Sequence, residues 1–161
     1  MSPAPAALDV LAVVLVWINP GITTESSCQE GFALNKSLLR STVILAVEDY
    51  APSRYLLSRN LSQAGYEVLE AATGSEALQY APNADAIVLD VHLPDIVGYE
   101  VCRRLKQDPA TAHVPVIFLT ATAHDPKSVE RGLQAGGAAY LREPIENETL
   151  IQTIKHLLFT I

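Results

Sequence analysis

The feature that most constrains the fold is a change of pattern at Ser41, after which short apolar runs alternate with amphipathic stretches. This alternation is typical of β-α units that build a parallel sheet. Three of the runs are almost continuously apolar, as expected for strands covered on both faces, whereas residues 66–71 alternate as an edge strand does. We therefore predict an α/β protein with a doubly wound parallel sheet. Its five strands are expected at Val43–Val47, Tyr66–Ala71, Ala86–Leu89, Val114–Leu119 and Ala138–Leu141.

The segments between these strands carry apolar residues at helical spacing, so each predicted helix has a stripe that packs on the sheet. Pro52 suits a first helical turn and Gly65 suits a helix C-terminus. The apolar stripes are Leu57, Leu61 and Ala64, then Val101 and Leu105, then Val129 and Leu133, and finally Leu150, Ile154, Leu157 and Leu158.

The first 40 residues contain few charges and have no clear period. Their apolar stretch, Val10–Ile18, is shorter than the roughly 20 residues that a membrane-spanning helix needs, and no Lys or Arg precedes it as in a signal peptide. Three interpretations of this segment are left open. They are a short buried or interfacial helix, a disordered leader, and upstream sequence added by a wrong start site. We expect an N-terminal extension of unassigned function over residues 1–40 and one domain over residues 41–161.

Charge and cysteine content narrow the class of protein. A formal net charge of −7 disfavours binding to nucleic acid or to an anionic membrane by bulk charge, so a protein partner is expected. Cys28 and Cys102 are far apart and form no metal-binding motif. We therefore expect a reducing cytoplasm, with Cys102 as a small core residue.

Acidic side chains follow several predicted strands at the points where these strands end. In an open parallel sheet, the functional crevice lies outside the carboxyl ends of the strands, and right-handed crossovers bring these ends together. A lone aspartate after a strand is usually a helix cap or turn former, but the joint pattern favours a site. Glu48 and Asp49 close the first strand, Asp90 the third and Thr120 the fourth, while Arg142 and Glu143 follow the fifth.

Crowded carboxylates repel one another and raise the cost of ionisation unless a cation is present. Oxygen ligands in small number, with room for water and a phosphoryl group, favour Mg²⁺ or Mn²⁺ over zinc. Such an ion could polarise a phosphoryl donor while an aspartate oxygen attacks in line to give an aspartyl phosphate. Thr120 would then donate its hydroxyl to the new phosphoryl oxygens.

The stretch Ile87–Gly98, which contains Asp90, resembles the phosphorylated segment of the receiver domain of bacterial two-component systems. Gly74–Leu78, Phe118–Ala121 and Ala135–Leu141 are similar to further segments of that family, and the resemblance runs from Thr42 to Leu158. It implies a flavodoxin-like fold with strand order 2-1-3-4-5. It also implies Asp90 as phosphoacceptor, Thr120 as switch hydroxyl, Tyr140 as switch aromatic, and Mg²⁺ held by Glu48, Asp49, Asp90 and the backbone carbonyl of His92.

One position departs from the family, which has Lys-Pro, usually with a cis peptide bond, where this chain has Glu143-Pro144. A glutamate reverses the charge of the lysine that normally pairs with the acceptor. If Glu143 faces the site, it either strengthens cation binding or leaves one acid protonated; if it points to water, the site merely lacks its cation. Arg142 could substitute, but adjacent strand residues point to opposite faces, which argues against it.

The resemblance implies a phosphoacceptor in a phosphorelay, with no turnover of an external substrate. Its expected partners are a sensor histidine kinase or phosphotransfer protein and a downstream protein target. A homodimer is an open alternative, and neither nucleic acid nor a membrane is expected as a partner. The competing hypothesis, motivated by Glu143, is an atypical receiver that docks without phosphorylation. A Mg²⁺-dependent phosphohydrolase or a flavodoxin-like cofactor binder is disfavoured, because no Gly-rich phosphate loop follows the first strand.

Overall fold

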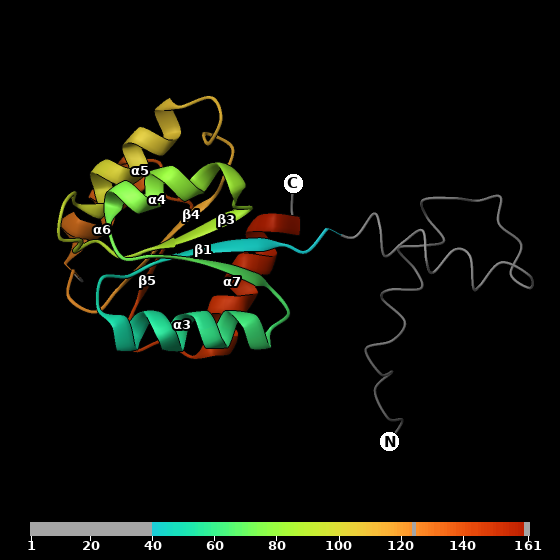
Figure 1. Ribbon diagram of the computed structural model, residues 1–161. Coiled ribbons are helices and arrows are strands. Elements are labelled where there is room, and N and C mark those ends of the chain that lie inside the picture. The colour runs from blue at the N-terminus through green and yellow to red at the C-terminus, as the bar shows by residue number, and fades with distance from the viewer. Residues whose placement is uncertain (1–39, 124, 160–161) are drawn as a thin grey trace, which may run out of the picture. The chain divides into compact units, whose positions relative to one another are not determined.

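The computed structural model of the chain describes residues 40–123 and 125–159 (Figure 1). The predicted N-terminal extension therefore lies outside the described residues, except for Arg40. None of the helices in the described ranges is both long and apolar enough to cross a membrane.

The sheet has five parallel strands in the order β2-β1-β3-β4-β5, which confirms the predicted fold class. Strand β2 lies at one edge, as its alternating pattern predicts. The fourth strand begins two residues later than predicted, because the amide of Val114 bonds the carbonyl of Thr111 in a turn rather than a neighbouring strand. The strands are β1 (Val43–Val47), β2 (Glu67–Ala71), β3 (Ala86–Leu89), β4 (Val116–Thr120) and β5 (Ala139–Arg142).

Helices cover both faces of this sheet, with α4, α5 and α6 on one face and α3 and α7 on the other (Figure 1). The buried residues accordingly form two apolar clusters, one containing Leu45, Leu89 and Phe118 and the other Ile44, Val88 and Ile154. The alternation of adjacent β1 residues between the clusters is the two-residue period of a strand. The helices are α3 (Ala51–Gln63), α4 (Gly74–Tyr80), α5 (Gly98–Gln107), α6 (Pro126–Gln134) and α7 (Asn147–Phe159), with a short 3₁₀ helix η1 at Ala81–Asn83.

Helix α6 packs differently from its predicted stripe. Leu133 is 52% exposed, so its prediction as a core residue is wrong. Gly132 is buried instead, and a Cβ atom there would lie 2.7 Å from the ring of Tyr140 and 3.2 Å from that of Phe118. The two aromatic rings take the space at the sheet, and the helix approaches them through its glycine.

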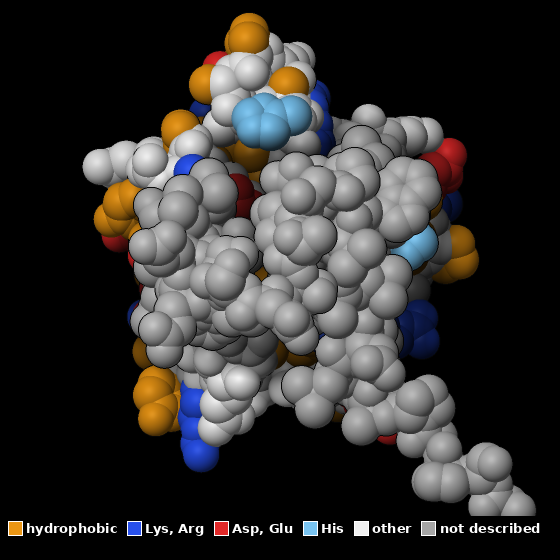
Figure 2. All heavy atoms as spheres, turned by 90° about the vertical axis from the view of Figure 1, so that its right-hand side faces the viewer, with side chains coloured by type: hydrophobic (Ala, Val, Ile, Leu, Met, Phe, Trp, Pro, Cys, Tyr) orange, Lys and Arg blue, Asp and Glu red, His pale blue; other side chains and the backbone are white. Residues whose placement is uncertain are grey.

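The end of the domain at which the strands begin faces the viewer in Figure 2. On the part of that face that is not grey, Lys, Arg, Asp and Glu side chains are scattered among apolar ones rather than gathered by sign. The visible part of this face therefore offers no basic footprint of the kind that nucleic-acid binding requires.

Candidate functional site

Three carboxylates meet where strands β1 and β3 end. Val47 pairs with Leu89 in the sheet, and the amide of Asp90 donates to the carbonyl of Val47 at 3.0 Å. This register brings Asp90 beside Glu48 and Asp49. Each of the three offers a carboxylate oxygen, and these oxygens lie within 4.8 Å of one another. The predicted convergence of acids from distant parts of the sequence is therefore present.

Burial and neighbouring carboxylates disfavour the charged forms of Glu48 and Asp90. Glu48 is only 9% exposed, and burial, followed by repulsion from Asp90, raises its pKa to about 7. Burial also raises the pKa of Asp90, although the backbone N–H groups of Val91 and His92 favour its charged form. The Val91 amide donates to an oxygen of Asp90 at 2.7 Å. A cation bound among these oxygens would relieve the repulsion, so the residues present fit a hard divalent ion.

The carboxylate of Glu143 belongs to the same site. Glu143 is half-buried in a pocket of about 320 Å³, and burial and the charge of Asp90 raise its pKa. Of the two alternatives for this residue, the structure favours the one in which it faces the site. Arg142 is exposed and is not among the lining residues. The pocket is lined by Glu48, Tyr50, Ser53, Asp90, His92, Ala121, Thr122 and Glu143.

Glu143 is held in place through its backbone. Its amide donates to the carbonyl of Thr120 at 2.9 Å, and the Glu143–Pro144 peptide bond is cis, as the resemblance implies. The bond to Thr120 extends the pairing of β4 with β5 to the edge of the site, and thereby fixes where the side chain of Glu143 begins.

The loop that carries Asp90 is anchored on both sides. A Cβ atom on Gly98 would lie 2.3 Å from the carbonyl oxygen of Asp90, so only glycine allows α5 to begin so close to this loop. Asp95 accepts hydrogen bonds from the amides of Gly74 and Ser75 and from the Ser75 hydroxyl, which hold its pKa well below the usual range. The loop is thereby tied to the start of α4.

Neither Thr120 nor Tyr140 is among the residues that line this pocket. Thr120 is fully buried, and its Oγ1 accepts weak hydrogen bonds from the amides of Thr122 and Ala123 at 3.3 and 3.4 Å. The hydroxyl of Tyr140 donates to the carbonyl of Ala123 at 2.6 Å and lies 3.2 Å from the hydroxyl of Tyr99. Tyr140 and Thr120 are therefore connected through the loop after β4.

Two further side chains contact residues of the predicted site and were not identified from the sequence. Arg54 donates to the backbone carbonyls of Glu48 and Asp49 at 2.8 and 3.2 Å, and thus positions the loop that carries both acids. Tyr99 contacts Tyr140 from α5. No sequence signal identifies either residue, because each acts through a contact between separate elements. Cys102 is buried, and burial raises the pKa of its thiol to about 11, as suits the predicted core residue.

Comparison with known proteins identifies relatives of this arrangement. The family model described as response regulator receiver domain matches residues 44–155. The chain is 37% identical over 119 residues to the response regulator PleD of Caulobacter vibrioides, and 37% identical over 118 residues to the polar-differentiation response regulator DivK of Brucella ovis. A crystal structure of a putative response regulator from Chloroflexus aurantiacus is similar at a TM-score of 0.70 and 38% identity, over 74% of this chain and 98% of that one.

The lengths covered differ between these relatives. The match to PleD covers 73% of this chain and 26% of PleD, so the chain spans about a quarter of that protein. The match to DivK covers 71% of this chain and 94% of DivK. The shared part is in each case the domain that contains the acid cluster.

Proposed function

This chain belongs to the response regulator receiver domain family, and we propose that Asp90 is the residue that accepts the phosphoryl group. As a receiver domain it is a phosphoacceptor of two-component signal transduction. The observation that carries the assignment to Asp90 is its position among three carboxylates, with a carboxylate oxygen in the acid cluster and a place in the lining of the open pocket.

The proposed reaction moves one phosphoryl group without turnover of an external substrate. An oxygen of Asp90 attacks the phosphorus of a phosphohistidine on a histidine kinase or phosphotransfer protein. The new P–O bond forms as the P–N bond breaks, and the leaving imidazole takes up a proton from solvent. The N–H group of Val91, which already donates to Asp90, keeps the attacking carboxylate oriented.

Glu48, Asp49, Asp90 and the backbone carbonyl of His92 would hold a Mg²⁺ or Mn²⁺ ion. When bound, the ion neutralises carboxylate charge and polarises the phosphoryl oxygens. Glu143 adds a fourth carboxylate where the family has a lysine. Phosphorylation of this chain therefore depends on the positive charge of the divalent ion. We propose that Glu143 makes the metal requirement stricter than it is in a receiver with lysine.

The output step is proposed to use Thr120 and Tyr140. A phosphoryl group on Asp90 would attract the hydroxyl of Thr120, whose Oγ1 now accepts only weak bonds from the loop after β4. Movement of that loop would shift the carbonyl of Ala123, to which Tyr140 is bonded. A downstream protein could read this change on the surface formed by α6, β5 and α7.

Phosphorylation can be tested by intact-mass measurement of the full chain after incubation with Mg²⁺ and a small-molecule phosphodonor. The proposal predicts a gain of one phosphoryl group that requires Mg²⁺ and is absent in Asp90→Asn. Asp108→Asn serves as a matched control, because Asp108 is exposed at the C-terminal end of α5 and does not belong to the acid cluster, and it should retain the gain. No gain in the native chain would contradict the proposal and favour docking without phosphorylation.

A further inference from the structure

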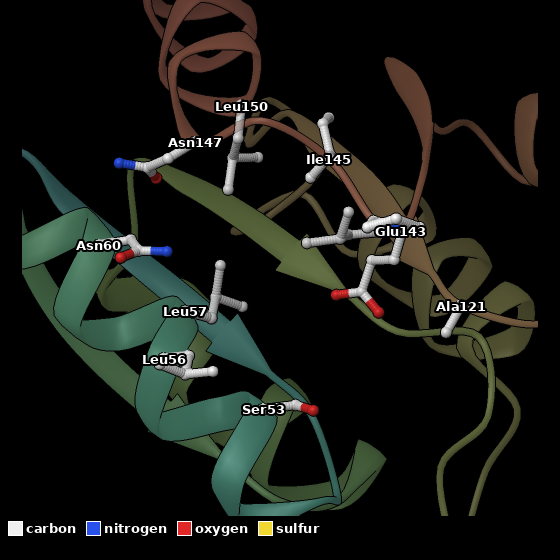
Figure 3. Close-up of a pocket in the computed structure, with 11 residues that line it drawn as sticks. Ser53, Leu56, Leu57, Asn60, Ala121, Glu143, Ile145, Asn147 and Leu150 are labelled. Carbon is white, nitrogen blue, oxygen red and sulfur yellow. The ribbon is translucent and has the colours of Figure 1, made fainter.

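A second pocket lies beside the acid cluster, between α3 and the start of α7 (Figure 3). Its volume is about 450 Å³, within the size range of small-ligand sites. Most of its walls are apolar and come from α3, from β4, from the segment between β5 and α7, and from α7 itself. They are formed by Leu56, Leu57, Leu119, Pro144, Ile145 and Leu150.

The polar groups of this pocket are separated into two ends. Figure 3 shows the carboxylate of Glu143 pointing from the loop after β5 into the space in front of α3, with Ser53 nearby on that helix. Asn60 and Asn147 lie at the opposite end, and Leu57 lies between the two ends. A ligand that spans the pocket therefore meets a carboxylate at one end, an apolar middle, and two amides at the other.

We propose that this pocket binds a lysine or arginine side chain of a partner protein, with the cationic end at Glu143 and the aliphatic stem along Leu57 and Leu150. The two asparagine amides suit the peptide groups that flank such a side chain, because each offers a donor and an acceptor. Basic side chains bury their methylene stems against apolar surface while their charged ends seek a polar partner.

Charge complementarity selects a basic side chain over an apolar or acidic one. Glu143 lines both pockets, and no Lys or Arg stands among the described residues that line either of them. Glu143 is half-buried at one end of the pocket and its carboxylate points into it, where a cation would compensate its charge. A neutral apolar ligand would leave this carboxylate without compensation, and an anion would add repulsion.

The surface around the pocket suits a protein as the source of that cation. Leu56 forms one wall and is 56% exposed, and the adjacent Tyr55 is 65% exposed. Exposed large apolar side chains beside a polar anchor are typical of protein–protein contacts. The partner would thus place a positive charge beside Glu143, the residue that stands where the family carries its own lysine.

This inference extends the proposed function and does not require that Asp90 be phosphorylated. It can be tested with butylammonium as the probe, on the full chain without phosphodonor, by following backbone amide shifts in ¹H–¹⁵N NMR spectra. We expect saturable shifts at Leu56, Asn60, Ile145 and Leu150 that persist with saturating Mg²⁺. Butanol, which has the same stem without the charge, should bind several-fold more weakly.

Three variants locate the binding. Glu143→Gln should weaken butylammonium binding about tenfold, the loss of one charge-assisted contact, and Leu56→Ser should weaken it without disturbing the core. Glu146→Gln, an exposed acid three residues along, should bind as the native chain does. Equal binding of butanol, undiminished binding by Glu143→Gln, or shifts that centre on Glu48 and vanish with Mg²⁺ would overturn the proposal. These outcomes are independent of the mass measurement, so failure of either proposal is distinguishable.

Discussion

The hydroxyl of Tyr140 donates a hydrogen bond of 2.6 Å to the backbone carbonyl of Ala123. Ala123 is also the residue whose amide donates to Oγ1 of Thr120. One residue of the loop after β4 therefore receives contacts from both proposed switch side chains. If Thr120 moves towards a phosphoryl group, the loop would move with it and displace the hydrogen-bond partner of Tyr140.

The bond between Tyr140 and Ala123 predicts a measurable loss of stability. Tyr140→Phe keeps the ring contact with Phe118 but removes the donor, and leaves the carbonyl of the buried Ala123 without this partner. We expect the free energy of unfolding to fall by about 1 kcal/mol in urea denaturation. Tyr99→Phe is the matched control and should cost less, because the bond to Ala123 is kept. Equal losses in the two variants would contradict the assigned role of the bond.

The close approach of α5 to the Asp90 loop gives a second prediction. In Gly98→Ala the added methyl group would meet the carbonyl oxygen of Asp90 at 2.3 Å, so the helix or the loop must move. We expect a loss of about 1–3 kcal/mol in unfolding free energy, together with slower phosphorylation. Gln107→Ala, an exposed change at the other end of α5, should leave both quantities near the native values. A native phosphorylation rate in Gly98→Ala would show that the loop position does not matter.

Much of this arrangement is predictable from the sequence, because strand period and strand ends determine which side chains meet. The continuous apolar runs predicted β1, β3 and β4, and the alternating run predicted that β2 lies at an edge of the sheet. Glu48, Asp49 and Asp90 followed from the rule that functional residues gather at the carboxyl ends of parallel strands. These inferences depend only on local pattern and topology.

Other features depend on contacts between separate elements, which no local pattern encodes. Leu133 fits a helical stripe, yet Gly132 makes the contact with the sheet, because the rings of Tyr140 and Phe118 occupy the space. Whether Glu143 faced water or the site likewise depended on how α3 and the loop after β5 enclose a pocket. Alternation along a strand predicted that Arg142 points away from the site, and Arg142 is exposed and is not among the residues that line the pocket.

The raised pKa of Glu48 predicts how stability depends on pH without metal. Its value is about 7 in the folded chain, against an ordinary value of 4.5. Between these values the folded state binds more protons than the unfolded state, so the free energy of unfolding falls as pH rises from about 5 to 8. We expect a decrease on the order of 2 kcal/mol, shared with the neighbouring Asp90, in urea titrations with a chelator present.

Two controls identify the source of that slope. Glu48→Gln should flatten it, whereas Glu67→Gln, an exposed change on β2, should leave it unchanged. Saturating Mg²⁺ should stabilise the native chain more at pH 8 than at pH 5, because protons and the ion compete for the same oxygens. A slope that survives in Glu48→Gln would place the responsible groups elsewhere.

The charge of Glu143 makes a prediction about metal affinity. Glu143→Lys places a cation in the pocket that contains Asp90, so Mg²⁺ should bind several-fold more weakly, with Glu143→Gln between the two. The same change should stabilise the metal-free chain at pH 8 by relieving repulsion. Calorimetric titration measures the first effect and urea denaturation the second. Glu146→Lys changes the net charge equally outside the pocket, and an identical effect from it would exclude a local cause.

The central claim, that Asp90 carries the phosphoryl group, is tested most directly by chemical localisation. After phosphorylation with Mg²⁺ and a small-molecule phosphodonor, reduction with borohydride converts an aspartyl phosphate to homoserine, which peptide mass spectrometry locates. The account predicts homoserine at position 90 alone, with none when Mg²⁺ is withheld. Homoserine at position 49 or at another aspartate, with position 90 unmodified, would contradict it.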